Sequence, residues 1–194
     1  MEILQEHHIL ASSNIFDKNE LKRLKKIVQS IVSQNQFVKG SVERNPNKID
    51  YCMLQTFEKI IRSSAPRLYG ILKKMKQDIM TATSVHFKHR WHVMVTSQGP
   101  NEQEWHYDNL KTRNYYTIII PLSNDSIKQG GTEFKKEVHD TNGTIYPPNT
   151  PLNLYKGVIV FRGTVMHRGT GNDYELPRIF LYLPLFIDTD PNEI

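Results

Sequence analysis

The chain has 194 residues, 38% of them hydrophobic and 23% charged, which is an ordinary composition for one folded domain and too short for two comfortable ones. Its single cysteine, Cys52, excludes an internal disulfide and a thiolate-rich zinc site. No apolar run reaches membrane-spanning length and the N-terminus lacks a secretory pattern, so we expect an intracellular, cytoplasmic protein without membrane contact.

Positive charge is concentrated in the N-terminal half. Residues 1–90 carry 16 Lys and Arg against 8 Asp and Glu (16 − 8 = +8), whereas residues 91–194 carry 9 against 12 (9 − 12 = −3). Such a surface can attract nucleic acid or an acidic protein. No aromatic residues alternate with the lysines, so solvated helix faces explain the charge more simply, and nucleic acid is the less favoured partner.

Residues 1–85 are predicted to be a helical support region. Asp17 and Glu20 form a capping box at the start of an amphipathic helix. A second helix is expected over residues 50–63, which would contain Cys52. Pro66 suits the first position of a third helix, where apolar residues from 68 to 79 recur at helical spacing.

From about residue 86 to residue 190 the pattern changes to short β-rich runs. They cover residues 91–96, 115–122, 132–134, 158–161 and 179–186, and turn formers such as Gly130-Gly131 separate them. Many short strands without intervening helices predict a barrel or sandwich. The expected fold class is therefore α+β and mainly β, one domain over residues 1–194, with the N-terminal helices packed on one sheet.

Three residues predict a metal site: His106 and Asp108 in Trp105-His106-Tyr107-Asp108, and the distant His167. On an extended segment, side chains two residues apart share a face, so His106 and Asp108 can converge on one point. Two histidines and one carboxylate suit iron(II) and leave positions open for other ligands. Nearby, His86, His89 and His92 would not share a face, and we expect them on the surface before a strand.

Arg178 opens the apolar run 178–186, where its planar guanidinium could hold a carboxylate with two parallel hydrogen bonds. Arg168 follows His167 directly and should point the opposite way, so Arg178 is the better candidate for binding an anion. Thr117 and Tyr115 alternate onto one face of their predicted strand and are candidates to assist it, although inward packing explains them equally well.

These residues, in this order, resemble the iron(II)- and 2-oxoglutarate-dependent oxygenases. The stretch Arg113…Thr117 followed by Gly130-Gly131-Thr132-Glu133-Phe134 is similar to the prolyl hydroxylase branch. The segment 103–108 is also similar to the phytanoyl-CoA hydroxylase branch, and both branches stay open. The likeness covers about residues 90–186.

The resemblance implies a double-stranded β-helix, a jelly-roll or cupin-like barrel. It implies iron(II) bound by His106, Asp108 and His167, with 2-oxoglutarate as cosubstrate, O2 as oxidant, and succinate and CO2 as products. By the same resemblance, Arg178 pairs with the far carboxylate of 2-oxoglutarate, helped by a hydroxyl such as that of Thr117 or Tyr115. The carboxylate ligand Asp108 favours hydroxylation over halogenation.

The substrate is open at this level. A protein side chain is the first expectation and a small molecule the second; oligomeric state has no sequence signal. One alternative is a nucleic-acid base oxygenase or demethylase, but residues 179–183 are apolar where that group carries a further asparagine and arginine. The other alternative is a non-catalytic jelly-roll binding module, against which the intact residues His106, Asp108, His167 and Arg178 argue.

Overall fold

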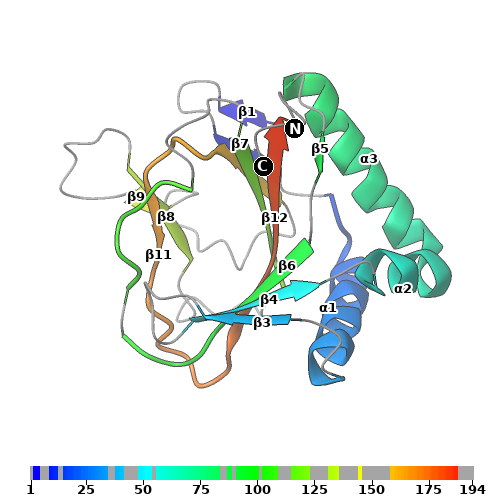
Figure 1. The fold of residues 1–194 in the computed structure, drawn as a ribbon, viewed down its shortest axis with the longest axis horizontal. Coiled ribbons are helices and arrows are strands. Elements are labelled where there is room, and N and C mark those ends of the chain that lie inside the picture. Colours follow the sequence, from blue (N-terminus) through cyan, green and yellow to red (C-terminus); the bar gives the residue numbers. More distant parts are fainter. Residues whose placement is uncertain are drawn as a thin grey trace.

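The computed structural model describes residues 2–4, 9–12, 15–34, 38–41, 48–53, 56–83, 87–88, 91–100, 102–108, 115–122, 131–135, 144–145 and 158–187. Within these ranges it contains three helices and twelve strands, the strands forming two antiparallel sheets (Figure 1). In the part of the chain that the structure describes, no helix is both long and apolar enough to cross a membrane.

The helices begin largely where local sequence signals place them. Helix α1 (Lys18–Ser33) starts at the predicted capping box: the Asp17 carboxylate accepts backbone N–H bonds from Asn19 and Glu20 at 2.8 Å each, and the Glu20 carboxylate accepts one from Asp17 at 2.9 Å. Helix α3 (Pro66–Thr83) begins at the predicted Pro66. Helix α2 (Thr56–Ser64) precedes it.

The prediction of a second helix over residues 50–63 is wrong in its first part. Residues 48–53 form strand β4 (Lys48–Met53), and α2 starts only at Thr56. Cys52 therefore lies in a strand, where it pairs with His92. Strand β4 is hydrogen-bonded on one side to β3 (Val38–Ser41) and on the other to β6 (Trp91–Thr96), and this pairing on both sides satisfies the backbone without a helix.

The large sheet contains nine of the described strands. Its order is β1-β2-β10-β7-β12-β6-β4-β3, with β5 paired to β12. The remaining strands of this sheet are β1 (Glu2–Leu4), β2 (Ile9–Ser12), β5 (Phe87–Lys88), β7 (Tyr115–Pro121), β10 (Val158–Arg162) and β12 (Arg178–Ile187). Four of them, β1 to β4, come from the first 85 residues, so the region predicted to be helical also supplies strands to the sheet.

The small sheet contains β8 (Thr132–Phe134), β9 (Thr144–Ile145) and β11 (His167–Gly169), in the order β11-β8-β9. Figure 1 shows it across from the large sheet, on the side away from the helices. The predicted runs 91–96 and 132–134 coincide with β6 and β8, and the other predicted strands end within one residue of those observed.

The two faces of the large sheet bury different clusters. On the outer face, under the helices, alternate strand residues pack against Leu24, Phe57 and Leu72 of α1, α2 and α3. The strand residues of this outer cluster include Val93, Ile118, Ile120, Val160, Leu181 and Leu183. The inner face, toward the small sheet, holds a smaller cluster of Met94, Ile119, Phe134, Ile159, Phe161 and Phe180. The prediction of N-terminal helices packed on one sheet is confirmed.

Candidate metal centre

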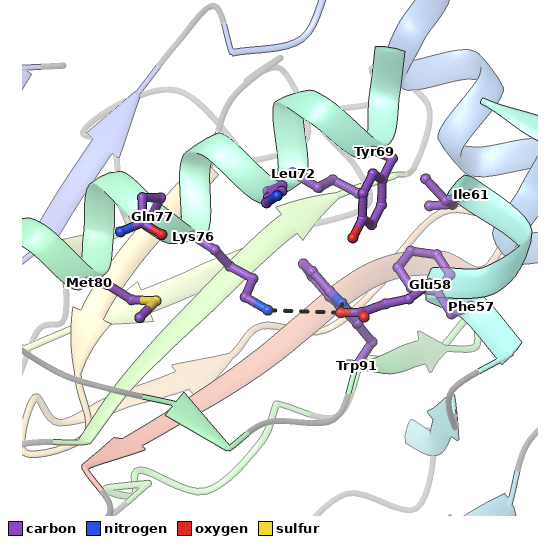
Figure 2. Close-up of a pocket in the computed structure, with 10 residues that line it drawn as sticks. Phe57, Glu58, Ile61, Tyr69, Leu72, Lys76, Gln77, Met80 and Trp91 are labelled. Atoms are coloured by element: carbon purple, nitrogen blue, oxygen red, sulfur yellow. Dashed lines mark hydrogen bonds and ion pairs between the residues drawn. The ribbon is translucent and has the colours of Figure 1, made fainter. Parts of the chain in front are cut away.

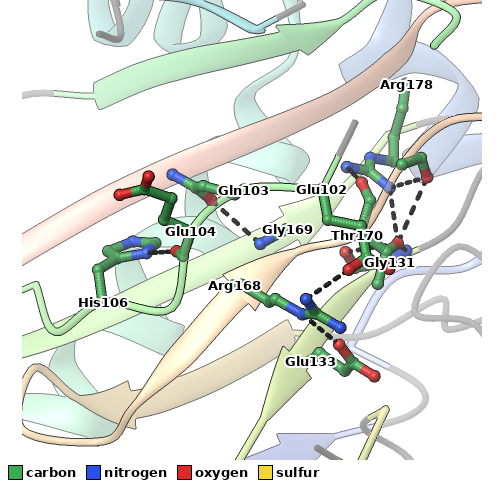
Figure 3. Close-up of polar contacts among 11 residues, drawn as sticks. Glu102, Gln103, Glu104, His106, Gly131, Glu133, Arg168, Gly169, Thr170 and Arg178 are labelled. Carbon is green, nitrogen blue, oxygen red and sulfur yellow. Dashed lines mark hydrogen bonds and ion pairs between the residues drawn. The ribbon is translucent and has the colours of Figure 1, made fainter. Parts of the chain in front are cut away.

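His106 and His167 lie directly opposite each other on paired backbone. Each donates its backbone N–H to the carbonyl of the other at 3.0 Å. The segment before His106 continues the pairing, because Gln103 N–H donates to the Gly169 carbonyl at 2.8 Å and Gly169 N–H donates to the Gln103 side-chain oxygen at 3.0 Å (Figure 3). This pairing brings the two imidazole rings to 4.4 Å between centroids, although 61 residues separate them in sequence (167 − 106).

The two rings are oriented in the same way. His106 Nδ1 lies 2.8 Å from the Glu104 carbonyl, and His167 Nδ1 lies 2.9 Å from the Val165 carbonyl. A carbonyl can only accept, so in each neutral ring Nδ1 carries the proton and Nε2 keeps its lone pair. Metal-binding histidines are oriented by bonds of this kind. His167 is further enclosed by the rings of Phe134 and Phe161.

Asp108 completes the group. Its Oδ1 lies 3.9 Å from His106 Nε2 and 3.6 Å from His167 Nε2, and one ligand atom from each of the three residues falls within 4.8 Å of the others. Its other oxygen, Oδ2, accepts a hydrogen bond from the Thr117 hydroxyl. Two ligands each about 2.1 Å from one ion lie about 3 Å apart at right angles. The predicted convergence of these three side chains is confirmed, and their atoms need to close only slightly to hold one metal ion.

Arg178 is the largest side chain that is almost fully buried, at 1% exposure. It points to the inner face with Phe180, whose ring lies 5.1 Å from the guanidinium carbon. Nη2 donates to the Thr170 carbonyl at 2.7 Å, and Nη1 donates to the Thr170 hydroxyl and the Gly171 carbonyl at 3.3 Å each (Figure 3). Burial lowers the pKa of Arg178 to about 10, so an anion beside it would be strongly stabilised.

The two assisting candidates lie on the inner face of β7, but not beside Arg178. The Thr117 hydroxyl is bound to Asp108. The Tyr115 hydroxyl lies 3.4 Å from that of Tyr182. Burial, then the charge of Asp108, raises the pKa of Tyr115 to about 12, and the same two causes raise the pKa of Tyr182. Both phenols therefore stay protonated at neutral pH. The role of Thr117 and Tyr115 in binding a cosubstrate stays a prediction.

Thr96 was missed by sequence reasoning. It is 1% exposed, it is the register partner of Arg178 on β6, and among the described residues its hydroxyl has no hydrogen-bond partner. A buried hydroxyl in this state is costly unless a ligand or water satisfies it. The available signal was the alternation in 91–96, which puts Thr96 on one face with His92 and Met94.

Arg168 points away from the metal group, as predicted. Its Nε donates to Glu133 on β8 at 2.6 Å, its Nη1 is ion-paired with Glu102, and its guanidinium lies over the Trp105 ring at 4.6 Å (Figure 3). Arg168 thereby ties the segment that carries His106 to both strands of the small sheet. This explains its sequence neighbourhood without a role in binding an anion.

One further histidine departs from expectation. His92 lies within β6, half-buried, and its ring contacts Tyr182 edge-on at 5.7 Å, so the expectation of a surface position before the strand is wrong for it. The pairing of β6 with both β4 and β12 encloses this position. His86 and His89 lie outside the described residues.

No protein-family model and no curated protein matches the chain. Solved structures do. The non-heme alpha-ketoglutarate-dependent epimerase SnoN from nogalamycin biosynthesis aligns with a TM-score of 0.66 at 11% identity, covering 98% of this chain and 84% of SnoN. A Pseudomonas putida prolyl-4-hydroxylase aligns with a TM-score of 0.65 at 10% identity, covering 93% of each chain.

A third similar structure is a Trichoplax adhaerens prolyl hydroxylase in complex with a hypoxia inducible factor peptide fragment. It aligns with a TM-score of 0.65 at 11% identity, covering 94% of this chain and 84% of that one. Identities this low establish likeness of fold. The chain therefore has the fold of the non-haem iron enzymes that depend on 2-oxoglutarate (alpha-ketoglutarate), as its sequence motifs predict.

Proposed function

We propose that the chain is an iron(II)- and 2-oxoglutarate-dependent oxygenase that hydroxylates its substrate. The observation that carries the proposal is the convergence of His106, Asp108 and His167 on one point of the inner face, in a fold shared with enzymes of this type. The predicted double-stranded β-helix belongs to the same proposal: the two facing sheets of Figure 1 suit a jelly roll.

In this proposal the chain's own residues hold and orient the metal. His106 and His167 bind through Nε2 because their Nδ1 atoms are bound to backbone carbonyls. Asp108 binds through Oδ1 alone because Thr117 occupies Oδ2. Bound iron would supply the activation of O2, and the balanced reaction converts substrate C–H, 2-oxoglutarate and O2 into C–OH, succinate and CO2.

The cosubstrate's far carboxylate is assigned to Arg178. A buried guanidinium gains most from a bidentate carboxylate, and the 1% exposure of Arg178 excludes water that would weaken that pair. Thr96 is the best-placed hydroxyl to assist, because it lies opposite Arg178 in register and needs a partner. This assignment replaces Thr117, whose hydroxyl already serves Asp108.

A protein side chain is the proposed substrate class. Two of the similar structures are prolyl hydroxylases, and one of these is a complex with a peptide. Against a nucleobase, the exposed lysines of α1 and α3, among them Lys22, Lys26 and Lys73, lie on helices that cover the outer face, away from the metal group. The basic charge of the N-terminal half therefore does not surround the candidate centre.

The decisive experiment measures succinate release from 2-oxoglutarate with iron(II) under air, alone and with peptide pools, RNA or DNA oligonucleotides. We expect slow release alone, stimulation by a peptide, and a peptide product heavier by one oxygen. The Asp108→Ala variant is the background. Stimulation by oligonucleotides only, with an oxidised or demethylated base, would overturn the substrate class. Turnover equal to that of Asp108→Ala under every condition would leave the non-catalytic binding module.

A further inference from the structure

A second cavity lies on the opposite side of the large sheet from the candidate metal centre. Its volume is about 300 Å³, and α2, α3 and the first residue of β6 enclose it (Figure 2). The residues that define its character are Phe57 and Glu58 of α2, Leu72, Lys73 and Lys76 of α3, and Trp91 of β6. This size is at the lower end of small-molecule pockets.

The floor of the cavity is apolar and aromatic. Trp91 and Phe57 are buried, at 4% and 1% exposure, and their ring centroids lie 5.4 Å apart with the planes tilted by 59°. Leu72 of α3 adds an aliphatic wall at 4% exposure. These side chains are held by the outer cluster, so the floor is preformed.

The polar part of the cavity is a charged group at one end. Figure 2 shows the Lys76 side chain extending through the cavity toward Glu58, beside the indole of Trp91. The Lys76 ammonium lies 3.8 Å from a Glu58 oxygen, and Trp91 Nε1 donates to the same oxygen at 3.4 Å. Both distances are long for charge-assisted bonds.

The charge in the cavity is not balanced. Two of its lining residues are lysines, Lys73 and Lys76, and Glu58 is the carboxylate among them. The Lys76 side chain is only 21% exposed, whereas that of Glu58 is 48% exposed and so better solvated. Burial lowers the pKa of Lys76 despite the opposing effect of Glu58. An additional anion near Lys76 would stabilise its charged form.

We infer that this cavity is a second binding site, and that it takes a small carboxylate with an apolar body. The apolar part would lie on Trp91, Phe57 and Leu72, and the carboxylate would bind the Lys76 ammonium. A neutral apolar molecule would leave the charge imbalance unchanged, and a cation would meet two lysines. The inference does not rest on the proposed oxygenase activity, because none of these residues belongs to the candidate metal centre.

The test is calorimetric titration of the full chain with octanoate, and with octanol and octyltrimethylammonium as neutral and cationic probes of the same chain length. We expect octanoate to bind once per chain and more tightly than either probe. Lys76→Met should weaken octanoate binding about tenfold, the loss of one charge-assisted bond. Lys73→Met should weaken it less, because Lys73 is more exposed.

Lys74→Met is the matched control: Lys74 is on the same helix and pairs with Asp78 at 2.7 Å outside the cavity, so octanoate affinity should not change. Asp108→Ala should also bind octanoate normally, whether or not the chain is an oxygenase. The inference is overturned if octanoate does not bind, or if Lys74→Met loses as much affinity as Lys76→Met. Equal affinity for octanol would show an apolar groove suited to a partner protein, and preference for the ammonium an aromatic cage; either overturns it.

Discussion

The two faces of the large sheet are built by the same strands but serve different ends. In β12, Leu181 and Leu183 point outward and are fully buried under the helices, at 0% exposure each. Arg178 and Tyr182 alternate with them and point inward. In β7 the same alternation puts Ile118 outward and Thr117 toward Asp108. A period of two thus separates apolar packing from polar chemistry within a single strand.

The difference shows where the fold obtains its stability and where it tolerates cost. Burial raises the pKa of Tyr115 to about 12 and lowers the pKa of Arg178 to about 10, so the inner face holds polar groups in surroundings that disfavour their charged forms. The Thr96 hydroxyl adds a further cost. The outer cluster contains apolar side chains from three helices and five strands, and it can compensate for the inner face.

The largest expected change in stability comes from the outer face. Leu183→Ala should lower the free energy of unfolding by about 2–5 kcal/mol, because it leaves a cavity in the main core. Tyr182→Phe, one residue away on the inner face, should change it by about 1 kcal/mol or less, because it deletes one weakly bonded hydroxyl. Urea denaturation measures both. A greater loss from Tyr182→Phe would mean that the inner face is the stabilising one.

The largest expected change in ligand binding comes from the inner face. Asp108→Ala and His167→Ala should each weaken iron(II) binding about a hundredfold or more, above the loss typical of residues that only orient a ligand. The free energy of unfolding should be nearly unchanged, since the outer cluster is intact. Anaerobic calorimetry gives the affinity, with Asp173→Ala as an exposed control. Normal iron affinity in either variant would place the metal elsewhere.

Sequence reasoning succeeded where a signal was local. The capping box at Asp17, the proline that starts α3, the strand 91–96 and the opposite directions of His167 and Arg168 all follow from neighbouring residues. The His-X-Asp motif is also local, and its extended backbone allows two ligands to converge. The third ligand, His167, could be placed only through the resemblance of the whole motif order to a known family.

What was missed depends on pairing between distant segments. Residues 48–53 alternate in polarity yet precede a helical stretch, and only pairing with β6 decides for the strand. Thr96 gains its significance from lying opposite Arg178, 82 residues later (178 − 96). The backbone pairing of His106 with His167, which orients the metal ligands, leaves no pattern within either segment.

Arg178 and Arg168 test the assignment of sides within the small sheet and β12. Arg178→Lys keeps a charge but loses the planar fork, so 2-oxoglutarate affinity of the iron-loaded protein should fall about tenfold. Arg168→Lys should leave that affinity nearly unchanged, because Arg168 binds Glu102 and Glu133 on the outside of the small sheet. Anaerobic calorimetry with 2-oxoglutarate measures both. The reverse order would make Arg168 the cosubstrate anchor.

The smallest expected effects come from two threonines of the inner face, and they separate its two halves. Thr117→Val removes the hydrogen bond to Asp108 Oδ2, so iron(II) affinity should fall about tenfold. Thr96→Val removes a hydroxyl proposed to bind the cosubstrate, so 2-oxoglutarate affinity should fall about threefold to tenfold, and iron affinity should not change.

Because valine matches threonine in shape, neither variant should disturb packing, and each affinity reports on one hydroxyl. Without a cosubstrate, Thr96→Val should raise the free energy of unfolding slightly, since it removes a buried hydroxyl that lacks a partner among the described residues. Urea denaturation of the metal-free protein measures that gain. If Thr117→Val instead weakens 2-oxoglutarate and leaves iron binding intact, Thr117 is the assisting hydroxyl, and the separation of the inner face into a metal half and a carboxylate half fails.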